Sequence, residues 1–193
     1  FGEDGLPASI TANGCELLTQ PMRFNVYQGD HLLPWHQQAP EVTYRSPGAI
    51  EWRTEAAAPG LSSRTEARME YDGHVTYRVT LSADQETNLQ DCALELPMRR
   101  EVARYLMGIG HKGGYRPAEW SWKWGGQVYF DSFWMGDVPA GVQLELRGAS
   151  YCGPMVNLYW SLGQLQPPDS WNNGGAGGCI ISDQGDDAAL AVA

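Results

Sequence analysis

Short runs of alternating apolar and polar residues, separated by turn-forming glycine and proline, constrain the fold of this chain more than any other feature. Glu41–Arg45 and Ala49–Arg53 alternate in this way and are separated by a Ser-Pro-Gly turn. Arg64–Glu70 leads into Tyr71-Asp72-Gly73-His74 and then into the alternating run His74–Leu81. An Asp-Gly pair between two alternating runs is the strongest local signal for a β-hairpin. The pattern therefore predicts antiparallel hairpins.

The strand pattern continues along the chain and is interrupted by one helix candidate. Met98–Met107 has apolar residues at helical offsets and ends at Gly108, which predicts one short helix. The further predicted strands are Leu89–Leu96, closed by Pro97, then Val128–Trp134, Gly141–Arg147, Val156–Leu162 and Cys179–Ser182. Roughly eight to ten short strands with Gly- and Pro-rich turns indicate an all-β chain. We expect a single antiparallel β-sandwich domain over residues 1–193, with long Gly/Trp-rich loops.

Composition and charge exclude several classes of protein. The chain has 13 Lys and Arg against 23 Asp and Glu, which gives a formal net charge of −10 at pH 7. An acidic chain without a Lys/Arg-rich run is a poor partner for nucleic acid, so we expect no nucleic-acid partner. No apolar run approaches the roughly 18 residues of a membrane helix, so we expect no membrane insertion. With 42% apolar residues, the chain is also too rich in core-forming side chains for a disordered protein.

The two ends of the sequence suggest a piece of a longer protein. The chain starts at Phe1 with neither a Met nor a charged-then-apolar signal pattern. It stops within Ala188–Ala193, which has the pattern of an apolar strand, and half a strand leaves an unpaired edge. We therefore expect a trimmed or incomplete piece of a longer, multidomain protein.

The cysteines allow a disulfide but do not indicate a metal site. Cys15, Cys92, Cys152 and Cys179 lie far apart in the sequence, so three pairings are open. None forms a Cys-x-x-Cys motif and none has a nearby His, so we expect no metal. Cys92 alternates onto an apolar face, where packing as a small hydrophobe is the other interpretation. An even number of cysteines in a Trp-rich, Lys-poor chain fits an exported protein, and we expect an extracytoplasmic location: secreted, periplasmic or cell-surface.

Two Gly-rich stretches, 108–126 and 166–178, interrupt the strand pattern and contain half of the tryptophans. Long irregular loops in a compact domain are usually functional or disordered, and the Trp content of the first argues against disorder. If Trp120–Trp124 is extended, its three indoles share one face, with neighbouring indoles about 6.8 Å apart. Flat aromatic faces suit sugar rings, whose hydroxyls also need polar partners such as Arg116, Glu119 and Lys123. The alternative is that the indoles are core residues or cover a sheet.

Nucleotide and cofactor chemistry find no support in the sequence. The glycines at 108, 110, 113 and 114 follow a helix-like segment and lead into extended chain, which is the inverse of a nucleotide-binding loop. We interpret them as glycines that allow positive φ and a close approach of the backbone. The acidic run Asp183–Asp187 fails the calcium-loop pattern and is interpreted as a solvated turn. We therefore expect no cofactors.

The carboxylates offer a weak case for catalysis. Asp131 and Asp137 are six residues apart in the sequence, which on one straight strand is about 20 Å. The two carboxyl groups of a glycosidase are roughly 5–9.5 Å apart, so these two do not form the pair unless the chain doubles back. A cross-strand pair such as Asp131 with Glu145 stays open. The sequence contains neither a metalloprotease His pair nor a serine nucleophile elbow.

Several segments occur in an order that resembles a known family. They are Glu95–Arg99 (ELPMR), 107–117 (MGIGHKGGYRP), Trp120–Trp124 (WSWKW), Trp134–Gln143 (WMGDVPAGVQ) and Ser170–Cys179 (SWNNGGAGGC). The series resembles the β-sandwich region of bacterial proteins related to glycoside hydrolase family 123, over about residues 92–181. The resemblance implies a sandwich module upstream of a (β/α)₈ catalytic barrel that acts on amino-sugar or related glycans. The catalytic Asp-Glu pair of that family lies in the barrel and has no match here, so the resemblance implies no catalytic residue in this chain.

The sequence supports three functional hypotheses. In the first, a non-catalytic carbohydrate-associated module of a glycoside hydrolase presents loop side chains to a glycan; the candidates are Trp120, Trp122, Trp124, Arg116, Asp137, Trp171 and Asn172. In the second, the module braces the catalytic barrel of the same longer chain, which is then its partner. In the third, the chain is itself a glycosidase that uses Asp131, Asp137 or Glu145. Trp52, Trp134 and Trp160 lie in strand-like runs and are expected in the core.

Overall fold

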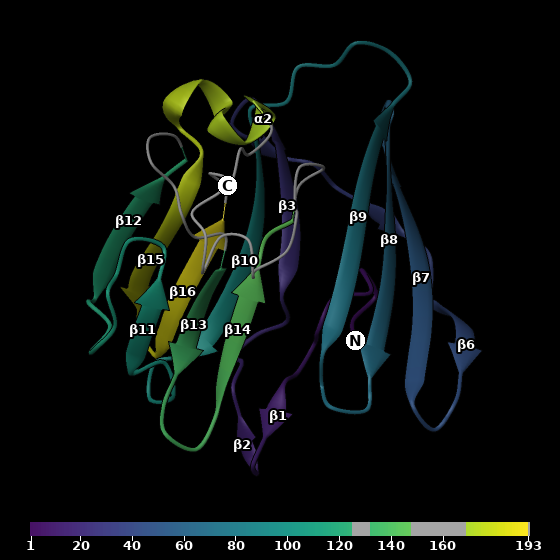
Figure 1. Ribbon diagram of the computed structural model, residues 1–193. Coiled ribbons are helices and arrows are strands. Elements are labelled where there is room, and N and C mark those ends of the chain that lie inside the picture. The colour runs from purple at the N-terminus through teal and green to yellow at the C-terminus, as the bar shows by residue number, and fades with distance from the viewer. Residues whose placement is uncertain (125–131, 148–168, 193) are drawn as a thin grey trace, which may run out of the picture. The chain divides into compact units, whose positions relative to one another are not determined.

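The computed structural model of the chain describes residues 1–124, 132–147 and 169–192 (Figure 1). Apart from the short helices α2 (Asp169–Asn172) and η1 (Asn173–Gly175), the regular elements of these residues are strands. The predicted all-β, antiparallel sandwich class is confirmed. Two compact units are present: unit 1 comprises Phe1–Ala8 and Pro21–Cys92, and unit 2 comprises Ser9–Gln20 and Ala93–Ala193. The expectation of one domain over residues 1–193 stays a prediction.

Unit 1 contains one long antiparallel sheet and a small hairpin. The hairpin pairs β3 (Arg23–Gln28) with β4 (His31–Leu32). The sheet comprises β5 (His36–Gln37), β6 (Glu41–Arg45), β7 (Ala49–Ala58), β8 (Leu61–Glu70) and β9 (Val75–Ala83), and both β5 and β6 pair with β7. The predicted hairpins β6–β7 and β8–β9 are confirmed.

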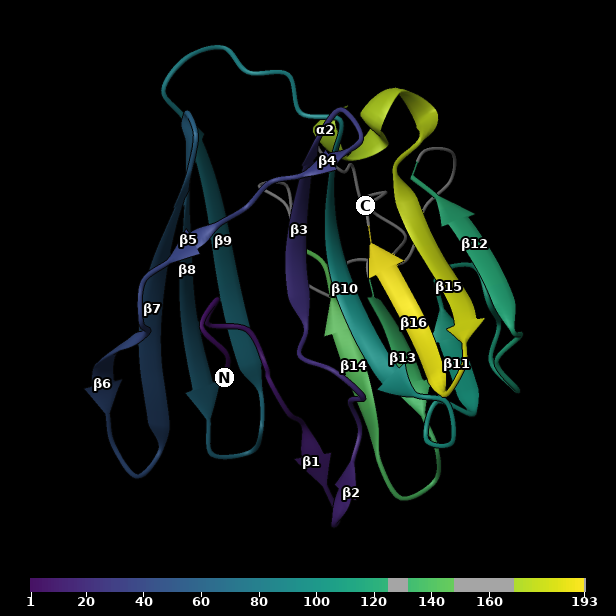
Figure 2. The ribbon, with the colours of Figure 1, turned by 180° about the vertical axis from the view of Figure 1, so that it is seen from behind.

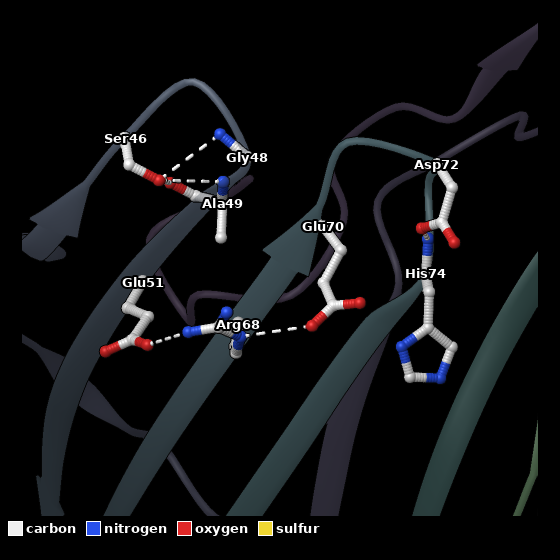
Figure 3. Close-up of polar contacts among 8 residues, drawn as sticks. All are labelled: Ser46, Gly48, Ala49, Glu51, Arg68, Glu70, Asp72 and His74. Carbon is white, nitrogen blue, oxygen red and sulfur yellow. Dashed lines mark hydrogen bonds and ion pairs between the residues drawn. The ribbon is translucent and has the colours of Figure 1, made fainter.

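The side chains at the two predicted turns explain why the chain reverses there (Figure 3). The Ser46 hydroxyl accepts hydrogen bonds from the N–H groups of Gly48 and Ala49, at 3.2 and 3.1 Å. The Asp72 carboxylate accepts a hydrogen bond from the N–H of His74 at 3.0 Å. Short polar side chains favour turns because they bond to backbone groups two or three residues away. The turn residues of the sequence therefore act through local hydrogen bonds.

One face of the long sheet is apolar and is covered by the N-terminal segment of the same unit. Trp52 is 3% exposed, and its Nε1 donates a hydrogen bond to the carbonyl of Gly5 at 2.8 Å. Its indole stacks on the ring of Phe1 with a centroid distance of 4.7 Å. A cluster of buried residues, Val26, Leu33 and Leu61, completes the apolar packing of unit 1. The prediction that Trp52 is a core residue is confirmed.

The opposite face of the same sheet is charged. Glu51 of β7 lies opposite Arg68 of β8, and Arg53 lies opposite Glu66. Arg68 forms ion pairs with both Glu51 and Glu70 (Figure 3). These side chains are largely exposed, and exposed ion pairs contribute little to stability. Alternating charges across neighbouring strands are typical of a solvated sheet face.

Unit 2 contains two sheets and a small hairpin. One sheet has the strand order β12 (Glu119–Lys123), β15 (Gly178–Gln184), β16 (Asp187–Val192) and β10 (Asp91–Arg99). The other has the order β11 (Tyr105–Gly108), β13 (Ser132–Gly136) and β14 (Gly141–Glu145), and β1 (Thr11–Ala12) pairs with β2 (Cys15–Glu16). The three-stranded sheet lies in front of β10 and β16 in Figure 1 and behind them in Figure 2, so the two sheets form layers of a sandwich.

The facing sides of these two sheets carry the core of unit 2. Buried side chains recur at every second residue along β10, β15 and β16, and again along β11 and β13. Those exposed by 2% or less are Leu96, Met98, Cys179, Ile181, Ala188, Leu190, Leu106, Phe133 and Met135. Side chains alternate across a strand, so the pattern that predicted the strands also places these residues on one face. The predicted strand at Cys179–Ser182 is confirmed. The acidic run Asp183–Asp187, interpreted as a turn, does reverse the chain, since Gln184 pairs with Asp187.

The predicted helix at Met98–Met107 is wrong, and so is the end of the preceding strand at Pro97. β10 continues to Arg99, and Pro97 lies opposite Ala189 within the sheet. The Arg99 carbonyl accepts hydrogen bonds from the N–H groups of Val102 and Ala103, which closes a single turn before β11 begins. Apolar residues at helical offsets also fit a strand, a turn and a second strand. Pairing with β16 and β13 decides between these two structures.

Several expectations fall outside the described residues. These are the strand Val156–Leu162, the first part of Val128–Trp134, and the side chains of Asp131, Cys152 and Trp160. Ser132–Trp134 and Gly141–Glu145 do form the predicted hairpin. Among the described cysteines, Cys15, Cys92 and Cys179 are free thiols. Cys92 packs on the Val26 cluster, and burial raises the pKa of its thiol, as for a small hydrophobe.

Candidate functional site

The tryptophans of the WSWKW segment lie on a regular strand, not in an irregular loop. Glu119–Lys123 forms β12, the edge strand of its sheet, and Trp120 and Trp122 lie opposite Ile181 and Cys179 of β15. Both indoles therefore point to the face that carries the core, and both are half-buried. Trp124 follows the strand and is 5% exposed. The three indoles share a face as predicted, and that face is largely covered.

A cluster of three indoles, here called the tryptophan cluster, joins Trp122, Trp124 and Trp171. The ring centroids of Trp122 and Trp124 are 4.8 Å apart at an interplanar angle of 79°, an edge-to-face contact. Those of Trp124 and Trp171 are 5.0 Å apart at 54°. A Cβ on Gly177 would lie 1.8 Å from the Trp171 carbonyl oxygen, so only glycine fits there. Trp171 is half-buried and the neighbouring Asn172 is exposed, so the cluster reaches the surface at helix α2.

The Gly-rich segment before β12 packs against the two tryptophans of that strand, Trp120 and Trp122. Nε1 of Trp120 donates a hydrogen bond to the carbonyl of Ile109 at 3.0 Å, and the His111 ring meets the Trp120 indole edge-on at 5.3 Å. Gly110 has a φ of +79°, and a Cβ at this position would lie 2.9 Å from Cδ1 of Trp122. All four glycines of this segment have a positive φ, as interpreted, whereas a close approach is confirmed at Gly108 and Gly110 and not at Gly114, where a Cβ would meet nothing within 4 Å.

Arg116 is held inside the protein. Its side chain is 5% exposed and donates hydrogen bonds to the carbonyls of Ala103 and Pro117, both at 2.7 Å. It also forms an ion pair with Asp183 at 2.7 Å. A guanidinium that is buried and has these partners fixes the geometry of the chain around it. Arg116 therefore has few donors left for a ligand.

Asp137 lies in the turn of the β13–β14 hairpin, where Arg104 binds it. Nη1 of Arg104 donates to Oδ2 of Asp137 at 3.1 Å, and the other carboxylate oxygen accepts the N–H of Val138 at 2.8 Å. The carbonyl of Arg104 accepts the N–H of Arg116 at 2.8 Å. Six of the seven candidates thus fall into two groups, and the seventh, Trp120, packs on the Gly-rich segment instead. Arg116 and Asp137 meet through Arg104, whereas Trp122, Trp124, Trp171 and Asn172 gather at helix α2.

A pair of tyrosines beside Arg104 was not among the candidates of the sequence. The rings of Tyr105 and Tyr115 are 5.0 Å apart at 32°, and the guanidinium carbon of Arg104 lies 5.6 Å from the centre of the Tyr105 ring. The hydrogen bond between the two phenols raises the pKa of Tyr105. Tyr105 was hidden by the helix prediction, and Tyr115 is brought beside it by an isolated bridge. An alternating reading of residues 105–108 would have drawn attention to Tyr105.

Unit 1 contains a cavity that is lined by one carboxylate among apolar and neutral polar side chains, but it is too small for a sugar. Asp4, Trp35, Thr54 and Thr65 are among the residues that line it, and its volume is about 20 Å³, room for one water molecule. Burial raises the pKa of the Asp4 carboxyl. In the part of the chain that the structure describes, no group of three His, Cys, Asp or Glu side chains could hold a metal ion. No described helix is long and apolar enough to cross a membrane.

The comparisons with known proteins assign the chain to a family. It matches the family model described as glycoside hydrolase 123, third domain, over residues 1–193. No curated protein and no solved structure matches it. The match covers the whole sequence, including the part before residue 92, where the resemblance of the motifs is vague. The chain therefore belongs to the family of glycoside hydrolase 123 third domains.

Proposed function

We propose that this chain is a non-catalytic module that binds glycan for the glycoside hydrolase of which it is a part. The observation that carries the proposal is the match to a glycoside hydrolase third domain over all 193 residues. The β-sandwich fold, with aromatic side chains at its surface, suits a binding role. Chemistry on the glycan is then the task of another part of the longer protein.

The contacts of the candidate acids support a role without catalysis. Asp137 is bound by Arg104 at 3.1 Å, and Glu145 is bound by Arg147 at 2.9 Å. The general acid of a glycosidase must reach the glycosidic oxygen with a carboxyl oxygen that is not already engaged, and both of these carboxylates are held by a guanidinium. Asp131 lies outside the described residues. The two described acids are therefore better suited to recognition than to proton transfer.

The tryptophan cluster supports the binding role because the exposure of its residues increases from Trp124 toward helix α2. Trp124 is buried and holds the cluster from inside, whereas Trp171 is half-buried and Asn172 is exposed. An indole fixed by its neighbours presents its free face without a further loss of side-chain entropy on binding. Among the candidates of the sequence, Trp171 and Asn172 are the pair that a glycan reaches most directly.

Two measurements on the purified chain test this proposal. The first is release of chromophore from a panel of chromogenic glycosides, for which we expect no turnover. The second is affinity for soluble glycans, measured by affinity electrophoresis and calorimetry. We expect at least one glycan to bind with a dissociation constant below about 1 mM, which corresponds to a favourable binding free energy of at least about 4 kcal/mol.

Each measurement has an outcome that overturns part of the proposal. Turnover that is abolished by Glu145→Gln or Asp137→Asn would make the chain an enzyme. A folded chain that binds no glycan at millimolar concentration would remove the binding role and favour the module as a brace for the catalytic barrel.

A further inference from the structure

The outer face of the three-stranded sheet of unit 2 carries a surface of aromatic and apolar side chains, here called the tyrosine platform: Tyr105, Met107, Tyr115 and Trp134. Tyr105 and Met107 alternate with the fully buried Leu106 and so lie on the face away from the core. Met107 lies opposite Trp134 of β13, and Tyr105 is bridged to Tyr115. Tyr115 is 71% exposed and Met107 is 57% exposed.

The indole of Trp134 packs on this face against two glycines of the β13–β14 hairpin. Gly136 and Gly141 are paired across the β13–β14 hairpin, and Gly136 also lies opposite Tyr105. A Cβ on either glycine would lie 2.8 or 2.7 Å from Cζ2 of Trp134, so the indole rests where two side chains are missing. The prediction that Trp134 is a core residue is corrected accordingly, since it is half-buried on the outer face. The two glycines therefore let the Trp134 indole lie directly on the backbone of the sheet.

A charged pair borders the two tyrosines. The guanidinium of Arg104 lies against the Tyr105 ring and donates to Asp137, and the Arg104 side chain is 50% exposed. A guanidinium has five N–H donors, and the carboxylate holds one of them in this contact. Donors therefore remain at the edge of the tilted tyrosine pair. Gln143, which lies opposite Trp134 on β14 and is exposed, adds a donor and an acceptor on the same face.

We propose that the tyrosine platform binds one or two pyranose rings of a neutral glycan. The apolar C–H face of the sugar lies on Tyr115 and Tyr105, and its hydroxyls bond to Arg104, Asp137 and Gln143. This inference deepens the proposed function and rests on its glycan binding, but it places the contact away from the tryptophan cluster.

The chemistry of the surface favours this occupant over others. A sugar ring needs an aromatic face bordered by donors and acceptors; Arg104 and Asp137 border Tyr105, and Gln143 lies opposite Trp134. A net charge of −10 disfavours an anionic polysaccharide. Four aromatic and apolar side chains make a small patch for a stable protein interface, which buries about 800 Å² on each partner.

The test compares matched variants of the whole chain for affinity to neutral soluble glycans: chito-oligosaccharides, a mixed-linkage glucan and a galactan. Tyr115→Ala removes an exposed ring of the platform, and Tyr71→Ala removes a ring of unit 1 that is 87% exposed. Arg104→Ala and Arg68→Ala form a second pair of exposed arginines. We expect Tyr115→Ala and Arg104→Ala to weaken binding at least tenfold, and the other two to leave it unchanged.

The outcomes separate this inference from the proposed function. Binding that survives Tyr115→Ala and Arg104→Ala but is lost in Asn172→Ala overturns the platform and leaves the module a glycan binder at helix α2. Absence of binding by the unaltered chain overturns both. If the chain forms dimers that Tyr115→Ala dissociates in sedimentation experiments, the platform is an interface between copies, and the inference is wrong.

Discussion

The long sheet of unit 1 and the three-stranded sheet of unit 2 both have one covered face, yet their outer faces differ in kind. In unit 1 the outer residues of β7 and β8 are charged, with Glu51 opposite Arg68 and Arg53 opposite Glu66. In unit 2 the outer residues of β11 and β13 are Tyr105, Met107 and Trp134. Charged faces are what solvated sheets normally carry, whereas a patch of exposed aromatic side chains marks a surface that contacts something else. We interpret this difference as that between a solvated face and the face for which we propose glycan binding.

The glycines at the hairpins of the two sheets also differ in their roles. Gly73, between β8 and β9, has a φ of +87°, and a Cβ there would meet nothing within 4 Å. Gly136, at the end of β13, is needed for the opposite reason, because the space of its Cβ is taken by Gly141, Ala140 and the Trp134 ring. The first glycine serves the conformation of a turn, and the second serves the packing of a surface.

The largest expected effect tests that distinction. Gly136→Ala places a Cβ 2.4 Å from the Cα of Gly141 and forces the hairpin apart, so we expect the free energy of unfolding to fall by about 2–3 kcal/mol. Gly73→Ala meets no atom and costs only the left-handed conformation, about 1 kcal/mol. Urea unfolding followed by tryptophan fluorescence measures both. Equal losses in the two variants would contradict the comparison.

A smaller effect is expected from one carboxylate in each unit, with opposite dependence on pH. Hydrogen bonds from the Ser9 hydroxyl, and then from the N–H groups of Leu18 and Ile10, lower the pKa of Glu16 from 4.5 to about 2. Its contribution to stability is therefore present above about pH 4.5 and lost as the pH falls toward 2. Burial raises the pKa of Asp4 above 3.8, so the folded state binds that proton more tightly and loses stability as the pH rises through the raised value.

The matched variants are Glu16→Gln and Asp4→Asn, followed by urea unfolding between pH 2 and pH 7. We expect Glu16→Gln to destabilise the chain at pH 7 and to flatten the loss of stability toward acid. Asp4→Asn should remove the loss of stability that accompanies a rise in pH through the raised pKa of Asp4. The variant keeps the oxygen that accepts the Leu6 N–H at 3.0 Å. A change of the same sign in both pH profiles would contradict the two pKa directions.

The smallest expected effect is that of Arg68→Ala. Its ion pairs with Glu51 and Glu70 lie on the solvated face, where screening by water leaves little net energy. We expect no measurable change in the urea midpoint at moderate salt. A clear loss of stability would mean that the charged face is a structural part of unit 1, and the contrast with the tyrosine platform would lose its basis.

The hairpins were predictable from sequence because their signals are local. Asp72-Gly73 and Ser46-Pro47-Gly48 reverse the chain through side-chain and backbone preferences that act within four residues. The helix expected at Met98–Met107 failed since its apolar spacing fits either structure, and partners far away in the sequence decided between them. Met98 pairs with Ala188, and Leu106 pairs with Met135.

The candidate site was predicted in part. The shared face of Trp120 and Trp122 follows from the two-residue period of a strand, which the sequence contains. Whether that face is covered depends on the Gly-rich segment that packs on it through Ile109 and Gly110, and no local pattern records such a contact. Tyr115 was missed for the same reason, since its neighbour Tyr105 is joined to it by a single bridge.

The sequence by itself determined the hairpins β6–β7 and β8–β9 with their turns, the charge balance and the family, because alternation, turn residues and ordered motifs are properties of short segments. The tertiary structure alone decided which face of each strand is covered and which side chains meet. Burial is a property of the partner layer, and Arg104, Tyr115 and Asp137 come together only when the hairpin and the Gly-rich segment pack at the same edge of a sheet.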